Sequence, residues 1–246
     1  MSQDRAYFIS DAHLGQGDAS VESRKVERLE SFLAHVRAHP GHLYIAGDLF
    51  DFWFEYRHAI PRGHTRILAA LSETRRAGVP VTYVCGNHDF WVDDYLTREL
   101  GIQVAQEPLR LEIQGKRVWV AHGDGLLSGD TGYRVLKAVF RFRPFIWMYR
   151  WLHPDIGIPL AKAVSRGSRD SQVHSMAVPM ERIRREIVDP RFAEGYDIVV
   201  LGHFHMAVHE RVGAREFVIL GEWITRGDAW VMEGGRMGRC GHSFEL

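Results

Sequence analysis

The segment LYIAGD, residues 43–48, is a short apolar run that ends in a glycine and an acid. This pattern predicts a buried β-strand whose chain turns at the glycine, so that the carboxylate projects beyond the edge of the sheet. Similar runs at residues 6–9 and 81–85 lie on either side of it, and helical patterns at residues 22–37 and 62–76 separate the three runs. The alternation predicts a βαβαβ unit.

The second half of the chain has a different pattern. Apolar runs at residues 109–113 and 118–121 flank a glycine-containing turn, and similar pairs surround Gly213 and the pair Gly234-Gly235. Such pairs predict antiparallel hairpins. Residues 197–201 predict one more buried strand. We therefore expect mixed sheets.

Length and composition indicate one α/β domain over residues 1–246. The chain holds 31 Lys and Arg and 31 Asp and Glu, so its net charge gives no reason to expect nucleic acid as a partner. Cys85 and Cys240 do not form a metal-type pair, and a reducing cytoplasm fits them. We expect no signal peptide and no membrane-spanning helix, because no apolar run approaches the length needed to cross a bilayer.

Residues 126–178 interrupt the α/β alternation and are too long to be a simple connection. We predict that they form an inserted helical cap, in which Pro144 kinks or restarts a helix. Between residues 133 and 169 there is one acid and a local net charge of +7. The basic residues are Arg134, Lys137, Arg141, Arg143, Arg150, Lys162, Arg166 and Arg169. Large apolar side chains alternate with these charges.

Polar motifs stand at the ends of five of the expected strands. They are Asp11-Ala12-His13, Gly47-Asp48 with Asp51, Gly86-Asn87-His88-Asp89, His122-Gly123-Asp124 and Gly202-His203-Phe204-His205. Taken singly, an Asp in a loop, an Asn after a glycine and a lone His are more often capping, turn or surface residues than ligands. Open α/β sheets, however, gather their sites at the carboxyl ends of strands. Because carboxylates, imidazoles and an amide suit Mn²⁺, Fe²⁺ or Zn²⁺, the five motifs together predict a site for two divalent cations.

The order and spacing of these motifs resemble those of the calcineurin-like metallophosphoesterase superfamily, over residues 10–205. The resemblance implies an α/β fold, a four-layer αββα sandwich of two mixed β-sheets. It implies that the first metal is held by Asp11, His13, Asp48 and His205. It implies that the second metal is held by Asp48, Asn87, His122 and His203, with Asp48 bridging the two.

The same resemblance implies catalytic roles. Two cations that share a water would lower its pKa and supply a bridging hydroxide as nucleophile. His88 would protonate the leaving oxygen or neutralise charge on the phosphoryl group, and Asp51 would hydrogen-bond His88 and orient it. We expect Asp89 and Asp124 to fix the side chains of the ligand His and Asn residues.

Within the superfamily the chain is most similar to the UDP-2,3-diacylglucosamine diphosphatase family of lipid A synthesis. The similarity lies in the segment 47–50, in Trp53, in Asp89-Phe90, in Gly132-Tyr133 and in the segment 220–223. The best-known members carry Arg and Glu where this chain has His88 and Asp51. The resemblance implies a lipid-linked nucleotide-sugar substrate. The candidate substrate-binding residues are Asn87, His88, Lys137, Arg166, Arg169, Phe140, Trp147 and Trp151.

Several alternatives remain open from the residues. The apolar cap residues either line an acyl groove or enter an anionic membrane surface at the inner face of the cytoplasmic membrane, or they pack the cap onto the body or onto a second copy. Mn²⁺ is the first choice of metal, with Fe²⁺ and Zn²⁺ as alternatives. Another nucleotide or lipid phosphate is an alternative substrate, and an inactive metal-binding scaffold is an alternative function. The oligomeric state is not encoded in a readable pattern.

Overall fold

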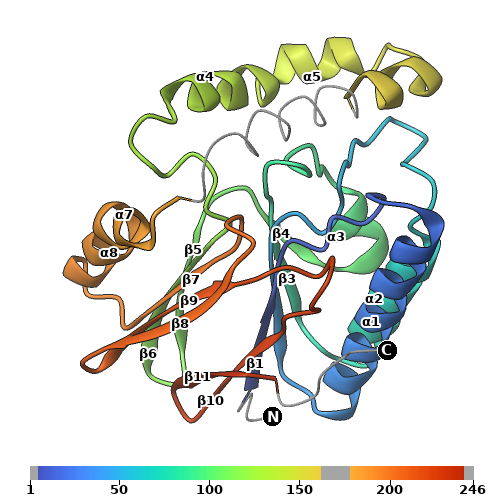
Figure 1. Ribbon diagram of the computed structural model, residues 1–246. Coiled ribbons are helices and arrows are strands. Elements are labelled where there is room, and N and C mark those ends of the chain that lie inside the picture. Colours follow the sequence, from blue (N-terminus) through green and yellow to red (C-terminus); the bar gives the residue numbers. More distant parts are fainter. Residues whose placement is uncertain (1–4, 162–177, 241–246) are drawn as a thin grey trace.

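The computed structural model describes residues 5–161 and 178–240. Two β-sheets lie face to face with helices on their outer faces, so that four layers follow one another across the molecule (Figure 1). The six-stranded sheet has the order β11-β10-β1-β2-β3-β4 and the five-stranded sheet the order β5-β6-β7-β9-β8. Both sheets are mixed. The predicted αββα sandwich is confirmed.

The first sheet is built on the predicted βαβαβ unit. Its strands are β1 (Arg5–Ile9), β2 (His42–Ala46), β3 (Val81–Val84), β4 (Gln103–Ala105), β10 (Trp230–Glu233) and β11 (Arg236–Arg239). Strands β1 to β4 pair in parallel, and the β10–β11 hairpin adds to the edge of β1. The carboxyl ends of β1, β2 and β3 therefore meet at one edge of the sheet.

The second sheet holds the other predicted hairpins and the predicted last buried strand. Its strands are β5 (Leu109–Ile113), β6 (Lys116–Ala121), β7 (Ile198–Leu201), β8 (Ala207–Val212) and β9 (Arg215–Leu220). Strands β5–β6 and β8–β9 pair antiparallel, whereas β7 pairs in parallel with β6 and β9. The carboxyl ends of β6 and β7 lie side by side.

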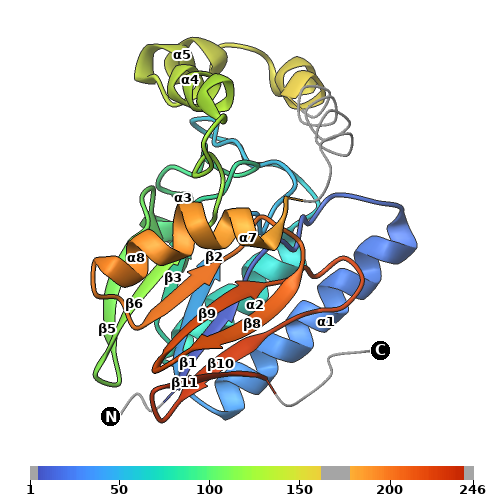
Figure 2. The ribbon, with the colours of Figure 1, turned by 60° about the vertical axis from the view of Figure 1, so that its left-hand side comes forward.

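Helices cover both outer faces. The first sheet carries α1 (Ala19–Ala38), α2 (Thr65–Arg76) and the short α3 (Tyr95–Leu100). The second sheet carries α7 (Met180–Ile183), a π-helical turn (Arg184–Val188) and α8 (Asp189–Ala193) (Figure 2). Helix α1 starts three residues before the predicted position, because the Asp18 side chain accepts hydrogen bonds from the backbone of Ser20 and Val21 and caps the helix.

Three buried apolar clusters fill the three spaces between the four layers. One lies between the sheets and includes Phe8, Val120 and Val200. A second lies under α1 and α2, and a third under the helices of the second sheet. Burial of apolar surface in all three spaces stabilises the stacking of the layers.

A layer of helices, the predicted cap, lies over the sheet edges that carry the five motifs (Figures 1 and 2). It contains α4 (Thr131–Phe140), α5 (Arg143–Tyr149) and a helical stretch at residues 154–161. Pro144 lies in the first turn of α5, so the predicted restart of the helix at this proline is confirmed. Residues 162–177 of the predicted cap lie outside the described residues.

The cap is attached to the body by an apolar cluster, in which Tyr149 of α5 packs with Phe52 and Phe54, and by polar contacts. No residue of α4 is buried. The Trp91 indole donates to the carbonyl of Phe140 at 2.8 Å, and the Arg150 guanidinium donates to the carbonyl of Glu55 at 3.2 Å. These contacts hold the helices above the sheet edge and leave space beneath them.

Glu55 joins the loop after β2 to the loop after β3. Its buried carboxylate accepts hydrogen bonds from the Trp53 indole at 2.9 Å and from the backbone nitrogens of Asp93, Asp94 and Tyr95 at 2.9 to 3.0 Å. The last three groups are N–H donors at the start of α3 that have no acceptor within the helix, and the helix dipole favours an anion there. One side chain thus fixes two of the loops that carry the motifs.

Glu55→Ala would leave these donors buried without an acceptor and should lower the free energy of unfolding by about 3 kcal/mol. Glu55→Gln keeps an accepting oxygen and should lose about half as much. Urea unfolding of both variants measures the effect. Glu107→Ala, at a side chain that is 85% exposed, is the control and should change stability by less than about 0.5 kcal/mol. Equal stability of Glu55→Ala and Glu107→Ala would contradict the role of Glu55.

Candidate metal centre

The five predicted motifs converge at the carboxyl ends of β1, β2, β3, β6 and β7. Within the described residues, the groups whose ligand atoms lie within 4.8 Å of one another are Asp11 with His13 and His205, Asp48 with His122 and His203, and His13 with Asp51 and His88. Both sheets contribute to this cluster. Residues as far apart in the sequence as His13 and His205, which are 192 positions apart, therefore share one site.

Left-handed backbone conformations are concentrated at this site. Among the described residues, six other than glycine have a positive φ, and five of them belong to the motifs. These five are Asp11, His13, Asp48, His203 and His205, with φ between 43° and 67°. Such conformations cost on the order of 1 kcal/mol each and persist where the surroundings enforce them. Here the strain turns the chain sharply at the strand ends and directs the side chains inward.

Two positions beside the ligands require glycine, because neighbouring side chains lie too close to leave room for a Cβ atom. A Cβ atom on Gly86 would overlap the Asp48 carboxylate, and one on Gly47 would overlap the His122 ring. Gly47 also has a φ of 89°, which side chains disfavour. These two positions therefore exclude any residue with a side chain.

The first cluster contains Asp11, His13 and His205. The Nε2 atoms of His13 and His205 lie 3.2 Å apart, and Asp11 Oδ1 lies 3.7 and 3.3 Å from them. Asp11 Oδ2 accepts a hydrogen bond from the His203 nitrogen, whereas the buried Oδ1 accepts none from the described residues. A buried carboxylate oxygen that faces two imidazole nitrogens fits a divalent cation.

The second cluster contains Asp48, His122 and His203, with Asn87 beside it. His122 Nδ1 lies 2.9 Å from the Ala46 carbonyl, which fixes that nitrogen as a donor and leaves Nε2 as the ligand atom. His122 Nε2 lies 2.9 Å from Asn87 Oδ1 and 3.2 Å from Asp48 Oδ2. Asp48 Oδ2 is also 3.8 Å from His13 Nε2. The Asp48 carboxylate thus lies between the two clusters.

The electrostatics of the clusters favour the ligand forms of Asp11, Asp48 and His203 at neutral pH, whereas they favour the protonated form of His122. Burial opposes ionisation of Asp48, but His122 and His88 hold its pKa well below the usual range, and His13 and His205 do the same for the pKa of Asp11. Burial, together with His122, lowers the pKa of His203 to about 4. Burial lowers the pKa of His122, but Asp48 more than offsets this and raises it. A cation at the second cluster would therefore release a proton from His122.

His88 and Asp51 are neighbours, although their contact differs from the expected one. His88 Nδ1 lies 3.0 Å from the backbone carbonyl oxygen of Asp51 and 3.7 Å from its carboxylate. The same carboxylate lies 3.9 Å from His13 Nδ1. The backbone of Asp51 thus orients the imidazole, and support from the Asp51 side chain stays a prediction.

Asp89 and Asp124 contact other groups than the ligand side chains. Asp89 Oδ1 accepts from the Gly86 nitrogen at 2.7 Å, and its other oxygen pairs with the Tyr83 hydroxyl, so that Asp89 fixes the backbone turn. Asp124 accepts from the Tyr133 hydroxyl at 2.5 Å and forms an ion pair with Lys137. Asp124 therefore ties α4 to the loop that carries His122.

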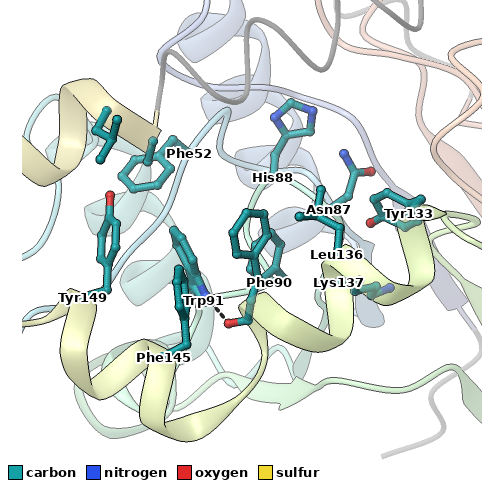
Figure 3. Close-up of a pocket in the computed structure, with 13 residues that line it drawn as sticks. Phe52, Asn87, His88, Phe90, Trp91, Tyr133, Leu136, Lys137, Phe145 and Tyr149 are labelled. Carbon is teal, nitrogen blue, oxygen red and sulfur yellow. Dashed lines mark hydrogen bonds between the residues drawn. The ribbon is translucent and has the colours of Figure 1, made fainter.

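A cavity of about 230 Å³ lies between the cap and the body, next to the metal ligands (Figure 3). Asn87 and His88 line one end of it, and most of the wall is aromatic. The rings belong to Phe52, Phe90, Trp91, Tyr133, Phe140, Phe145 and Tyr149. A polar reaction centre thus opens directly into an apolar space.

The structure separates the predicted substrate-binding residues into three groups. Lys137 and Phe140 line the cavity together with Asn87 and His88. Trp147 and Trp151 are not in its lining but lie on the outer surface, 64% and 76% exposed. Arg166 and Arg169 fall outside the described residues.

Sequence reasoning did not assign a site role to Phe52, Phe90, Trp91 or Tyr133. A signal was present for three of them, because Phe52 directly follows Asp51 of the second motif and the aromatic pair Phe90-Trp91 directly follows the third. Tyr133 stands next to no motif, and its contribution depends on how α4 packs over the loops.

Comparison with known proteins places these features in a family. Residues 5–207 match the model of the calcineurin-like phosphoesterases. The chain is 33% identical over 248 residues to a UDP-2,3-diacylglucosamine hydrolase of Porphyromonas gingivalis, covering 94% of each chain. It is 28% identical over 221 residues to the enzyme of the same name from Nitrosococcus oceani, covering 88% of this chain and 86% of that one.

A solved structure supports the fold. An archaeal phosphodiesterase superposes with a TM-score of 0.51 at 11% identity, covering 96% of this chain and 98% of the other. Members of the matched family use divalent metals, and the two clusters offer donors for them. The chain therefore belongs to the calcineurin-like phosphoesterase family of metal-dependent hydrolases.

Proposed function

We propose that the protein hydrolyses the pyrophosphate bond of UDP-2,3-diacylglucosamine and releases UMP and 2,3-diacylglucosamine 1-phosphate. The observation that carries this proposal is the aromatic cavity that opens at Asn87 and His88, beside the two clusters (Figure 3). A substrate with acyl chains and a diphosphate needs an apolar space adjoining a cationic centre. The names of the relatives point to the same substrate.

The proposed ligands follow from the two clusters. The first metal takes Asp11, His13, Asp48 and His205, and the second takes Asp48, Asn87, His122 and His203. When bound, two such cations activate a water and offset charge that develops on the phosphoryl oxygens. Oxygen and imidazole donors suit Mn²⁺, our first choice, and also Fe²⁺ or Zn²⁺.

His88 is the proposed general acid. Its Nδ1 atom is held by the Asp51 carbonyl, which leaves Nε2 as the atom that carries the proton to the leaving oxygen. The ring lies edge-on to His13 with centroids 4.8 Å apart, so it sits at the border of the first cluster. The proposed role of the Asp51 carboxylate, 3.7 Å from His88 Nδ1, is to help orient the imidazole.

The cavity walls are the proposed site of the acyl chains. Phe90 and Phe140 stack with centroids 5.9 Å apart, and Trp91 packs against Tyr149 at 5.0 Å, so the rings form one continuous apolar wall. Lys137 lines the cavity at the end nearest Asn87, where a phosphate would meet its ammonium group. The Asp124 carboxylate holds that ammonium in place. The residues 126–178 act as one inserted cap in this proposal.

The outer face of the cap is the proposed contact with the cytoplasmic face of an anionic membrane. Val139, Phe142, Trp147, Met148 and Trp151 are between 48% and 76% exposed, and so are not packed onto the body. Exposed arginines lie among them, a combination typical of interfacial helices. Among the described residues, no helix is long and apolar enough to cross a membrane.

Product analysis tests the substrate. The purified protein with Mn²⁺ should release UMP from UDP-2,3-diacylglucosamine at least about 100-fold faster than it releases phosphate from a generic aryl phosphate, because only the lipid substrate uses the cavity. Chelation of the metal should abolish both activities. Equal rates, or a preference for a nucleotide without acyl chains, would instead support the alternative of a different phosphoester substrate.

His88→Ala should lower kcat on the order of 10²-fold or more, as expected for the loss of a general acid. Its bound metal, measured by elemental analysis, should stay at the wild-type level because His88 is not a proposed ligand. His58→Ala, at an exposed histidine, serves as the control and should retain full turnover. Unchanged kcat in His88→Ala would refute the assigned role.

The double variant Trp147→Ser/Trp151→Ser should bind vesicles that contain anionic lipid about tenfold more weakly than the wild type, since two interfacial aromatic side chains are lost. Sedimentation with vesicles measures the bound fraction, and neutral vesicles provide the comparison for the charge contribution. Equal binding of the wild type and the double variant would contradict membrane contact through this face.

A further inference from the structure

Lys25 is a buried cation in the second turn of α1, with 1% of its surface exposed. Lysine is rarely buried to this extent unless its charge is paired. Its ammonium group contacts three acceptors. These are the carbonyl oxygen of His13 at 2.5 Å, the carbonyl oxygen of Gln16 at 2.9 Å, and the carboxylate of Glu22 at 2.9 Å. The two carbonyl oxygens accept hydrogen bonds from the ammonium group, and the Glu22 carboxylate pairs with its charge.

Glu22 extends this contact to the same loop. Its other carboxylate oxygen accepts a hydrogen bond from the Gly15 nitrogen at 2.8 Å. Glu22 and Lys25, on one face of α1, therefore hydrogen-bond the backbone at His13, Gly15 and Gln16. This loop leads directly from β1 to the helix, and it carries the first motif.

The backbone of this loop is strained at His13, the proposed metal ligand. His13 has a φ of 43°, a left-handed conformation that a residue with a side chain adopts only when its surroundings enforce it. The His13 nitrogen donates to the Asp48 carbonyl at 2.9 Å on one side of the residue. Lys25 holds the His13 carbonyl on the other side. Both peptide groups that flank the His13 side chain are thereby fixed.

The ring of His13 depends on this backbone for its direction. His122 has its Nδ1 atom held by the Ala46 carbonyl at 2.9 Å, the usual way in which a ligand imidazole is oriented. His13 Nδ1 has no hydrogen-bond partner among the described residues, and the closest carboxylate, that of Asp51, is 3.9 Å away. The two histidines are therefore positioned by different means.

We propose that Lys25, neutralised by Glu22, is a positioning residue that sets the direction of His13 and thereby the affinity of the first metal site. The proposal rests on the ligand assignment made under the proposed function. Because Lys25 touches no group of the second cluster, its effect is specific to the site of Asp11, His13 and His205.

Calorimetric titration of the metal-free protein with Mn²⁺ tests this proposal without substrate. Lys25→Met keeps an unbranched side chain of nearly the same length and removes the ammonium group with its three contacts. It should weaken Mn²⁺ binding at one of the two sites about 10- to 100-fold, the range found when the groups that orient a ligand are lost, and leave the other site unchanged. Glu22→Gln keeps Lys25 in place and should weaken the same site by a smaller factor.

Leu33→Ala is the control, because Leu33 is buried in the same helix, eight residues beyond Lys25. It should lower thermal stability and leave both Mn²⁺ affinities at the wild-type values. Wild-type affinities at both sites in Lys25→Met, or an equal loss at both, would overturn the positioning role. If Lys25→Met does not fold, Glu22→Gln decides the question by the same criterion. A wild-type protein that binds fewer than two Mn²⁺ ions would overturn the ligand assignment itself.

Discussion

The whole site depends on backbone hydrogen bonds that lock the ends of neighbouring strands to one another. The Asp11 nitrogen donates to the Gly47 carbonyl at 3.1 Å and the His13 nitrogen to the Asp48 carbonyl at 2.9 Å, while the Trp223 nitrogen donates to the Asp11 carbonyl. These bonds replace the regular ladder where the chain turns left-handed, and they hold strained residues in place. Without them the strained residues would relax, and the carboxylates and imidazoles would turn away from the site.

In the second sheet, hydrogen bonds to backbone carbonyl groups also hold the strand ends that carry the ligands. The Gly202 nitrogen donates to the Ala121 carbonyl, and the His122 ring donates to the carbonyl of Ala46 in the opposite sheet. A side chain from one sheet is thus oriented by the backbone of the other. The apolar layer between the two sheets fixes how they pack. It therefore also fixes the geometry of the metal centre.

Much of this architecture followed from the sequence, because local patterns encode it. Apolar runs followed by polar residues located β1, β2 and β3 to within one residue, and Pro144 located the break in the cap. The predicted ligands meet because parallel strands bring their ends to one edge. Contacts between distant segments escaped prediction. Nothing in the sequence around Glu55 or Lys25 shows which backbone groups each will meet, and Trp147 looked no different from a residue that faces inward.

The hydrogen bond from Trp91 to Phe140 has a consequence for how this enzyme can change. The indole reaches the main-chain oxygen of the last residue of α4, where the helix has no internal partner for it. The bond therefore persists whichever side chain stands at that position. A smaller or larger side chain at position 140 would change the depth of the apolar space, while Trp91 stays bonded to the backbone of that residue. In the proposed acyl-chain site, chain-length preference is thus adjustable in evolution at a single position, independently of the chemistry.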